Sequence, residues 1–297
     1  MKTAAIEVVA LRKMYAGREV LADVTMTVPK GETYALLGRN GQGKSTTIRT
    51  MLGLVSRDSG QVRVDGLDPQ KDSLKIRERV GYLAEDQQMY GWMTVTEIQK
   101  FLKPFYPTWD DELARKLQKD FELSAGTQIE HLSKGQNVRL GLLLALAHRP
   151  DIVILDDPAL GLDPIMRKEF MRDVIEHLQG NGVTVFFSSH LLYEIEMVAD
   201  RVAILDGGRI IRESPTEALR SGVRLFTLPA EAQAIAADLP AILDRKLSGR
   251  QCAVVTEDPE AVRNALTQSS ATFEETELNL DEIFEAYVIG NRGRNVK

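Results

Sequence analysis

Apolar and polar residues alternate at the start of the chain and predict half-buried β-strands. The alternation covers Ile6–Tyr15 and Val20–Val28, and its period of two places the apolar side chains on one face of a sheet. The next apolar run, Glu32–Leu37, is short and typical of a buried strand. Apolar residues then recur with helical spacing from Ser45 to about Leu54, so a strand leading into a helix is expected here.

The pattern changes twice further along the chain. It is mostly helical between Thr94 and His148, and from Asp151 short apolar strands alternate with helical segments again. Strands are expected at Gln61–Gly66, Ile152–Leu155, Val183–Ser189, Arg201–Asp206 and Arg209–Ser214, and helices at Pro164–Leu178 and Leu191–Ala199. A further strand that runs into a loop is expected over Arg79–Asp86. Strands that alternate with helices predict an α/β fold with a mainly parallel sheet and helices on both of its faces.

A domain boundary is expected at Ser221-Gly222. Residues 1–222 would form one domain, with an antiparallel β subdomain at its start and a helical subdomain at about 88–150. Beyond the boundary, strand and helix patterns alternate over 223–297 and predict a small α+β domain. The sequence leaves open whether this second domain regulates a dimer, stabilises it or contacts a further protein.

Composition limits the class of protein. Of the 297 residues 43% are hydrophobic and 27% are charged, which is typical of a soluble globular protein with a sizeable core. The net charge of −6 argues against a nucleic-acid surface, so no nucleic-acid partner is expected. Cys252 is the single cysteine, which excludes an intramolecular disulfide framework and favours a reducing, cytoplasmic compartment.

Membrane segments are not expected either. The chain begins without an apolar signal segment. The most apolar stretch, Leu140–Ala147, is much shorter than the roughly 18–20 residues that span a bilayer. If the protein works at a membrane, a partner has to supply the membrane-spanning part.

A glycine-rich motif follows the buried strand at Glu32–Leu37. The residues Gly38 to Ser45 match G-x-x-x-x-G-K-[ST], between a strand and a helix as this phosphate-binding motif requires. Backbone N–H groups of such a loop close around the β-phosphate of a nucleotide, and the helix N-terminus adds positive potential. Lys44 can reach the β- and γ-phosphates, and Ser45 can ligate Mg²⁺. The expected loop residues are Gly38, Asn40, Gly41, Gly43, Lys44, Ser45 and Thr46.

Two adjacent aspartates end the strand at Ile152–Leu155. Asp156 is placed as the carboxylate that holds Mg²⁺ in phosphate-loop enzymes. Seen alone, an acidic residue at a strand end is more often a turn or cap residue. The phosphate loop upstream reverses that balance, so ATP and Mg²⁺ are the expected ligands.

Further motifs resemble those of the ATP-binding cassette (ABC) ATPases. Leu132-Ser133-Lys134-Gly135-Gln136 is similar to the LSGGQ signature of that family, "ALGLDP" follows the two aspartates, and Ser189-His190 ends the next strand. Their order and spacing are those of the family over roughly residues 6–222. The resemblance implies a P-loop NTPase fold with a helical signature subdomain.

The resemblance also implies roles for single residues. Tyr15 resembles the aromatic that stacks on adenine, although it could be an ordinary strand aromatic. Ser133, Gly135 and Gln136 resemble the signature residues that contact the γ-phosphate bound by the opposite subunit, and Ser133 with Gln136 also reads as a helix capping box. His190 resembles the histidine that contacts the γ-phosphate and orients the attacking water. Lys44, Asp157 and His190 are therefore the expected catalytic residues.

Three positions depart from the family pattern. Lys134 replaces the first glycine of the signature. Glu85 stands where many members have a glutamine that senses Mg²⁺ and the membrane partner, and Gln87 and Gln88 are close enough to substitute for it. A glutamate can still bind the metal, so Glu85 is an expected Mg²⁺ ligand together with Ser45 and Asp156. Asp157 stands where members usually have the glutamate that polarises water, and its side chain is one methylene shorter. A carboxylate misplaced by about 1 Å can cost on the order of a hundredfold in rate, so slower hydrolysis is expected.

The resemblance implies the ATP-binding and hydrolysing subunit of an ABC transporter. Such a subunit forms a head-to-tail dimer, here expected to be a homodimer, and drives a separate membrane permease, so it would lie on the inner face of the cell membrane. Export is favoured by "GYLAEDQQMYGWMTV" and the helix pattern near the C-terminus. Met89, Tyr90, Trp92 and Met93 would either dock the permease or pack against the helical subdomain. An ATP-dependent dimerisation switch with impaired hydrolysis is the alternative, and a soluble ATPase that acts on DNA or ribosomes fits less well.

Overall fold

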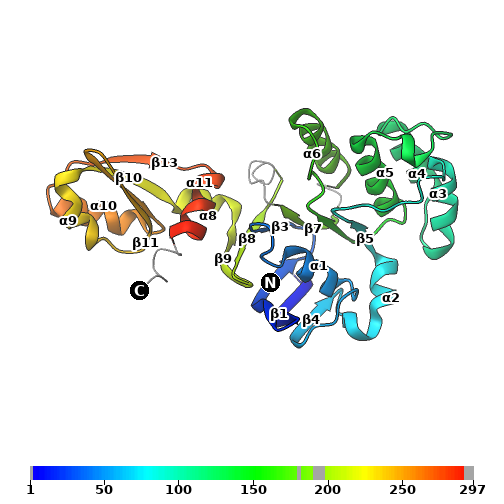
Figure 1. The fold of residues 1–297 in the computed structure, drawn as a ribbon, viewed down its shortest axis with the longest axis horizontal. Coiled ribbons are helices and arrows are strands. Elements are labelled where there is room, and N and C mark those ends of the chain that lie inside the picture. The colour runs from blue at the N-terminus through cyan, green and yellow to red at the C-terminus, as the bar shows by residue number, and fades with distance from the viewer. Residues whose placement is uncertain (1–2, 179–181, 190–197, 291–297) are drawn as a thin grey trace. The chain divides into compact units, whose positions relative to one another are not determined.

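The alternating runs at the start of the chain form long antiparallel strands, as predicted. In the computed structural model, which describes residues 3–178, 182–189 and 198–290, β1 (Ala4–Tyr15) pairs with β2 (Arg18–Pro29) and with β4 (Ser59–Val64). Buried residues alternate with exposed ones along β4 and much of β2, so one face of this layer is apolar. The layer is the antiparallel β subdomain expected from the sequence (Figure 1).

Short apolar strands form the parallel part of the same sheet. They are β3 (Thr33–Leu37), β5 (Val80–Leu83), β6 (Ile152–Asp156), β7 (Thr184–Ser189) and β8 (Arg201–Asp206). β9 (Arg209–Pro215) follows β8 through a turn at Gly207-Gly208 and pairs with β2. The described strands are therefore ordered β4-β1-β2-β9-β8-β3-β7-β6-β5. β3, β6 and β7 are buried along their whole length, as expected for parallel strands covered on both faces.

Helices surround this sheet. In the first part of the chain they are α1 (Lys44–Met51), α2 (Pro69–Arg79), α3 (Val95–Leu102), α4 (Asp111–Asp120), α5 (Lys134–Leu146) and α6 (Pro164–Leu178), with short 3₁₀ turns η1 (Lys103–Phe105) and η2 (Ile129–His131). α5 is apolar on most of its surface and packs against β5, α3, α4 and α6. The helical subdomain predicted near 88–150 is thus assembled around α5.

The core fixes the position of α1. Ile48 and Met51 of this helix belong to one buried apolar cluster with Ile6 of β1, Leu36 of β3 and Ile154 of β6. Side chains from the antiparallel and the parallel parts of the sheet therefore meet on one helix. The N-terminal end of α1, which follows the glycine-rich loop, is held rigidly as a consequence.

A second compact unit begins at Ser214, next to Glu213 at the end of the first. Its antiparallel sheet has the order β11-β12-β10-β13. Its elements are α8 (Thr216–Gly222), β10 (Arg224–Pro229), η3 (Ala230–Ala232), α9 (Gln233–Ala237), β11 (Ile242–Ser248), β12 (Gln251–Thr256), α10 (Pro259–Gln268), β13 (Glu274–Glu277), α11 (Leu280–Glu285) and the π-helical turn η4 (Ala286–Gly290). The boundary expected at Ser221-Gly222 stays a prediction, since α8, which ends at Gly222, belongs to this second unit.

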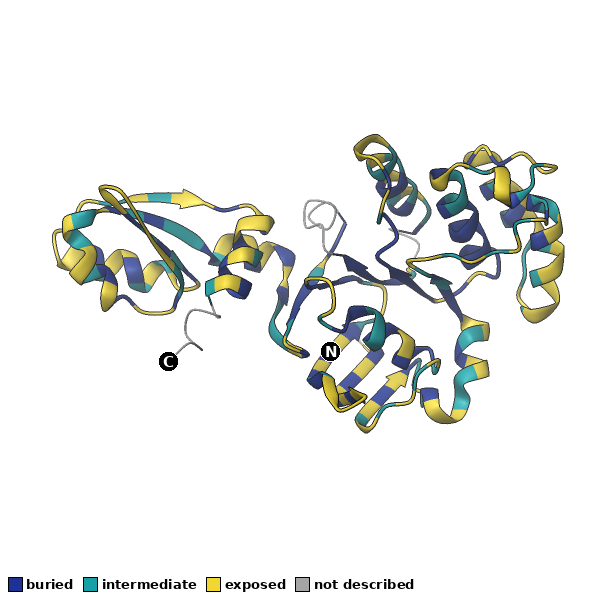
Figure 2. Cartoon of the chain, in the orientation of Figure 1, coloured by how far each residue is buried: buried dark blue, intermediate teal, exposed yellow. Residues whose placement is uncertain are grey.

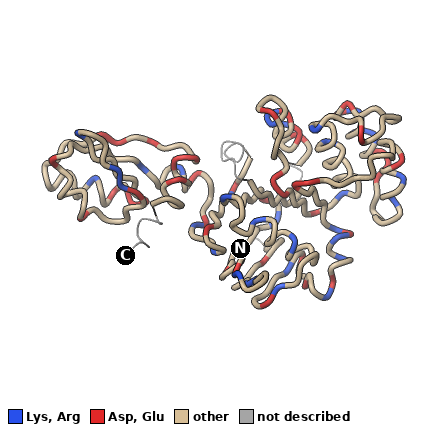
Figure 3. Tube along the Cα trace, in the orientation of Figure 1, with Lys and Arg blue, Asp and Glu red and all other residues tan. Residues whose placement is uncertain are grey.

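The core of this second unit lies between its sheet and the helices α9 and α10. Phe226 and Leu228 of β10, Val254 of β12, and Val262 and Leu266 of α10 are almost completely buried there (Figure 2). Acidic and basic positions are interspersed along the described part of both units (Figure 3). The α+β domain predicted after residue 222 is present with its own apolar core.

Some elements differ from the sequence-based expectations. α2, β11 and β13 were not anticipated, whereas β5 ends at Leu83 and leads into a loop, as expected. α2 buries only Pro69 and Ile76, so its sequence shows almost no apolar residues at helical spacing. β13 reads Glu-Glu-Thr-Glu and pairs at an edge, where acidic residues are common and apolar alternation is absent. The helix expected over 191–199 falls mostly outside the described residues.

We predict that Phe226→Ala destabilises the second unit without weakening nucleotide binding by the first. Removing this fully buried ring leaves a cavity that costs about 3–5 kcal/mol. Hydrogen-exchange mass spectrometry should show lost protection in β10 and β12, while β3 and β6 keep theirs and the Kd for ATP is unchanged. Equal loss of protection in both units would contradict the prediction.

Candidate nucleotide site

The register of the parallel strands brings the predicted chemistry to one edge of the sheet. Leu37, the last residue of β3, pairs with Ser189, and Asp156 pairs with Ser188. The glycine-rich loop begins directly after Leu37. The carboxyl ends of adjacent parallel strands are the usual place for ligands in open α/β sheets. The loop and both aspartates therefore share one site.

The glycine-rich loop leaves no room for side chains at two of its glycines. Gly43 has a φ of 107°, and a Cβ on it would lie 2.5 Å from Leu21 Cδ2. A Cβ on Gly38 would lie 2.7 Å from the carbonyl oxygen of Leu205. Gln42 in the same loop accepts a hydrogen bond at 2.7 Å from the N–H of Gly207, in the β8–β9 turn. Close packing against β2 and β8 therefore fixes the loop.

Lys44 begins α1 and lies almost buried beneath the loop. Its Nζ donates a hydrogen bond of 2.8 Å to the carbonyl oxygen of Gly38 and lies 3.9 Å from Asp157 Oδ2. Burial lowers the pKa of the Lys44 ammonium, and the nearby carboxylates of Asp157, Asp156 and Glu85 oppose that change. The side chain is held in place by the protein itself before any phosphate is present.

The two carboxylate oxygens of Asp156 have different surroundings. Its Oδ1 accepts hydrogen bonds from Ser188 Oγ at 2.8 Å and from Ser45 Oγ at 3.1 Å. Oδ2 is buried and has no hydrogen-bond partner within the described residues. Burial raises the pKa of Asp156, while the two hydroxyl donors act in the opposite direction. A buried carboxylate oxygen without a partner beside a hydroxyl is a good fit for a bound cation.

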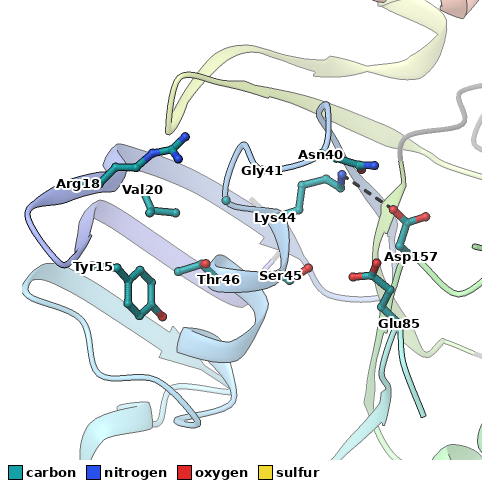
Figure 4. A pocket seen from close by; sticks show the side chains of 11 residues that line it. Tyr15, Arg18, Val20, Asn40, Gly41, Lys44, Ser45, Thr46, Glu85 and Asp157 are labelled. Carbon is teal, nitrogen blue, oxygen red and sulfur yellow. Dashed lines mark ion pairs between the residues drawn. The ribbon is translucent and has the colours of Figure 1, made fainter.

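Asp157 turns the chain sharply at the end of β6. Its φ is 45°, in the left-handed region that residues with a Cβ rarely occupy. The Asp157 N–H donates both to the carbonyl oxygen of Ser188, at 3.1 Å, and to its Oγ, at 3.0 Å. This turn carries the Asp157 carboxylate towards Lys44 (Figure 4). The carboxylate is only 5% exposed.

These residues line one cleft of about 580 Å³ (Figure 4). Its walls are Tyr15, Arg18, Val20, Asn40, Gly41, Gly43, Lys44, Ser45, Thr46, Glu85 and Asp157. Tyr15 is 44% exposed at the opposite end of the cleft from Asp157, and Lys13 Nζ lies 5.3 Å from the centre of its ring. Most of the residues predicted from the sequence are thus brought together. Arg18 and Val20 were missed, because neither belongs to a recognisable motif.

The signature-like segment lies elsewhere in the first unit and lines no part of this cleft. Ser133 caps α5: its Oγ accepts from the Gln136 N–H at 3.2 Å, and its own N–H donates to Gln136 Oε1 at 3.0 Å. The capping box expected from the sequence is therefore present. The end of the Met166 side chain, from α6, occupies the space where a Cβ on Gly135 would lie. Lys134 Nζ lies against Gly161, in the turn before α6.

Comparison with known proteins places these features in a family. A sequence model described as ABC transporter matches residues 21–160. The bacitracin transport ATP-binding protein BcrA of Bacillus licheniformis is 34% identical over 225 residues, covering 74% of this chain and 73% of that protein. This chain belongs to the ABC transporter family of ATP-binding proteins.

Other comparisons support the same assignment for the cassette. The linearmycin resistance ATP-binding protein LnrL of Bacillus subtilis (strain 168) is 32% identical over 206 residues, covering 68% of this chain and 66% of that protein. A solved structure titled as the ATP binding subunit of an ABC transporter shares 28% identity with a TM-score of 0.66, covering 74% of this chain and 92% of that one. The P-loop NTPase fold inferred from the sequence is confirmed.

Glu85 and Gln87 of the cassette face different cavities. Glu85 is exposed and lines the nucleotide cleft with Asp157 (Figure 4). Gln87 packs against Gly141 of α5 and, with Gln88, lines a separate groove of about 220 Å³. Of these three residues, only Glu85 is positioned to meet a nucleotide or its metal.

Ser45 and Asp156, two of the expected magnesium ligands, are hydrogen-bonded to each other, and His190 lies outside the described residues. Mg²⁺ usually takes one or two protein oxygens and fills its other positions with water and substrate phosphates. Ser45 Oγ and the open Oδ2 of Asp156 supply oxygens of this kind. Within the described part of the chain, no group of three or more His, Cys, Asp or Glu side chains is arranged to hold a metal. No described helix is long and apolar enough to cross a membrane.

We predict that Gly43→Ala is more destabilising than Gly41→Ala in the absence of nucleotide. Both glycines have positive φ, at 107° and 79°, but an added Cβ meets Leu21 only at Gly43. Conformational strain costs roughly 1–2 kcal/mol at either position, and overpacking adds about 1–3 kcal/mol at Gly43. Chemical denaturation of both variants without nucleotide tests this difference, and equal stabilities would show that the loop yields freely at Gly43.

Proposed function

We propose that this protein is the ATP-binding and hydrolysing subunit of an ABC exporter, with Mg²⁺ as cofactor. The observation that carries the proposal is the Asp156 carboxylate, buried at a strand end with one oxygen held by Ser45 and the other open. It stands beside a complete phosphate loop in a chain of the ABC transporter family. This combination suits a nucleotide whose phosphates arrive with a divalent cation.

Each residue at the cleft has a definite task in this proposal. Tyr15 offers an exposed ring for stacking against adenine. Loop N–H groups and the start of α1 bind the phosphates, and the Lys44 ammonium moves from the Gly38 carbonyl to the β- and γ-phosphates. Ser45 and Asp156 hold the metal, which would neutralise charge on the phosphates. Asp157 polarises the attacking water, with His190 assigned to orient it.

Asp157 can serve in spite of its short side chain. The left-handed turn at this residue directs the carboxylate to the phosphate loop, 3.9 Å from the Lys44 ammonium. Phosphoryl transfer depends mainly on positioning and electrostatics, so a carboxylate in this place retains its role. The reach lost with one methylene lowers the rate instead of abolishing it.

The location of the signature segment supports a dimer. Ser133, Gly135 and Gln136 lie at the start of α5 and do not line the cleft of their own chain. Capped helix starts of this kind bind anions well. In the proposed head-to-tail homodimer they would approach the γ-phosphate held by the other subunit. ATP would then close the dimer and hydrolysis would reopen it.

A membrane permease is the second proposed partner, and it would keep the protein at the inner face of the cell membrane. The groove lined by Gln87, Met89, Leu102 and Tyr106 is one docking place. An aromatic chain extends from there: Tyr90, Trp92, Phe101 and Phe105 are each 40–64% exposed, and neighbouring ring centres lie 5.5–6.0 Å apart. Met93 is 8% exposed and packs inside instead. Apolar patches of this type usually mark protein partners.

The names of two relatives support export as the direction of transport. BcrA is named for bacitracin transport and LnrL for linearmycin resistance. Resistance to a toxic compound is consistent with its removal from the cell. We therefore propose export of a compound that the permease selects.

Steady-state phosphate release tests the enzymatic proposal with Asp157→Asn as the variant. Neutralising this carboxylate removes the group that polarises water, so kcat should fall by a further hundredfold or so, while the Kd for ATP stays within about twofold. Unchanged hydrolysis would remove Asp157 from the mechanism. Wild-type protein that dimerises with ATP but releases no phosphate would instead identify a dimerisation switch.

The docking surface is tested by Trp92→Ala. Truncating an aromatic anchor at an interface costs about 2 kcal/mol or more, so recovery of a polytopic membrane protein with the tagged chain from solubilised native membranes should fall at least about tenfold. Basal ATPase activity of the isolated chain should not change. Leu74→Ala, at a 69% exposed position on α2, is the matched control. Equal recovery with both variants would place the permease elsewhere.

A further inference from the structure

Ser188 connects the two adjacent aspartates. It is completely buried near the end of β7, opposite Asp156 in the β6–β7 register. Its hydroxyl donates to Asp156 Oδ1 at 2.8 Å and accepts from the Asp157 N–H at 3.0 Å. A hydroxyl has one hydrogen to donate and lone pairs to accept, and Ser188 uses both functions on neighbouring residues of the site.

We infer that Ser188 is a positioning residue for the magnesium site and for the Asp157 carboxylate. The inference rests on the proposed ATP hydrolysis and adds a residue to it that no motif indicates. Ser188 does not line the nucleotide cleft. It acts through Asp156 and Asp157.

The first part of this role concerns the orientation of the Asp156 carboxylate. Two donors from different elements, Ser45 at the start of α1 and Ser188 in β7, meet on the single oxygen Oδ1. Rotation of the carboxylate would break both hydrogen bonds, so Oδ2 stays directed to the cation position. Ser45 is itself an expected metal ligand, and its orientation changes with the metal. Ser188 is the donor of the two that is not itself an expected metal ligand.

The second part concerns the backbone at Asp157. A left-handed φ of 45° is unfavourable for a residue with a Cβ, so neighbouring contacts must maintain it. The Asp157 N–H is held by the carbonyl oxygen and by the hydroxyl of Ser188. The hydroxyl therefore fixes the direction in which the short Asp157 side chain leaves the strand.

Loss of this hydroxyl should not unfold the protein. In Ser188→Ala, Asp156 Oδ1 keeps the Ser45 donor, and the Asp157 N–H keeps the main-chain carbonyl of residue 188. No buried polar atom loses its last partner. Function is thus expected to change more than stability.

The experiment measures ATP binding to the full chain by calorimetry, in EDTA and in excess Mg²⁺, together with kcat. In the wild-type protein, Mg²⁺ should lower the Kd for ATP relative to its value in EDTA. Ser188→Ala should leave the Kd in EDTA unchanged but make this lowering about ten- to a hundredfold smaller, as is typical when the partner of a metal ligand is removed. The kcat should fall as well. Ser188→Thr keeps the hydroxyl and should retain both properties.

Two further variants separate hydrogen bonding from packing. Ser188→Cys has nearly the volume of serine but a weak donor, so it should resemble the alanine variant. Thr184→Val, at the other end of β7, removes a hydroxyl that accepts the Gly31 N–H at 2.9 Å and should leave the Mg²⁺ effect intact. Full Mg²⁺ tightening in the alanine or cysteine variant would overturn the inference while leaving the proposed function standing. Wild-type protein with neither Mg²⁺ tightening nor hydrolysis would overturn the proposed function, and this inference with it.

Discussion

The burial of the Asp156 carboxylate is the constraint on which the site depends. A charged oxygen removed from water must gain hydrogen bonds or a cation. Asp156 accepts hydrogen bonds from two hydroxyl groups, and both are donated to the same oxygen, Oδ1. That asymmetry requires β6, β7 and the start of α1 to keep their relative positions, because Asp156 ends β6, Ser188 lies in β7 and Ser45 lies in α1. The apolar strands around it, buried on both faces, supply the rigidity.

The sequence predicted the elements that carry strong local signals. A glycine-rich loop between a strand and a helix, a carboxylate at a strand end and a capping box each follow from short-range chemistry, and the structure places all three accordingly. The polar helix α2 and the acidic strand β13 escaped prediction because they bury too little apolar surface to set a period.

Other features depend on contacts between distant residues. Ser188 appears in the sequence as one of two serines in an apolar run, and only the β6–β7 register shows that it meets both aspartates. The backbone turn at Asp157 is invisible in the sequence for the same reason, since aspartate has no strong preference for that conformation. The separation of Glu85 from Gln87 likewise depends on how the loop after β5 packs against α5.

The contact between Gly135 and Met166 joins the first turns of α5 and α6. Met166 fills the space that a Cβ at Gly135 would need, and its own N–H is held at 3.0 Å by the Asp163 cap that begins α6. Arg139 adds ion pairs from α5 to Glu169 and Asp173, about one and two turns further along α6. The starts of α5 and α6 are therefore linked by an apolar contact and by two ion pairs, which couples a tilt of the signature helix to the Asp163 cap.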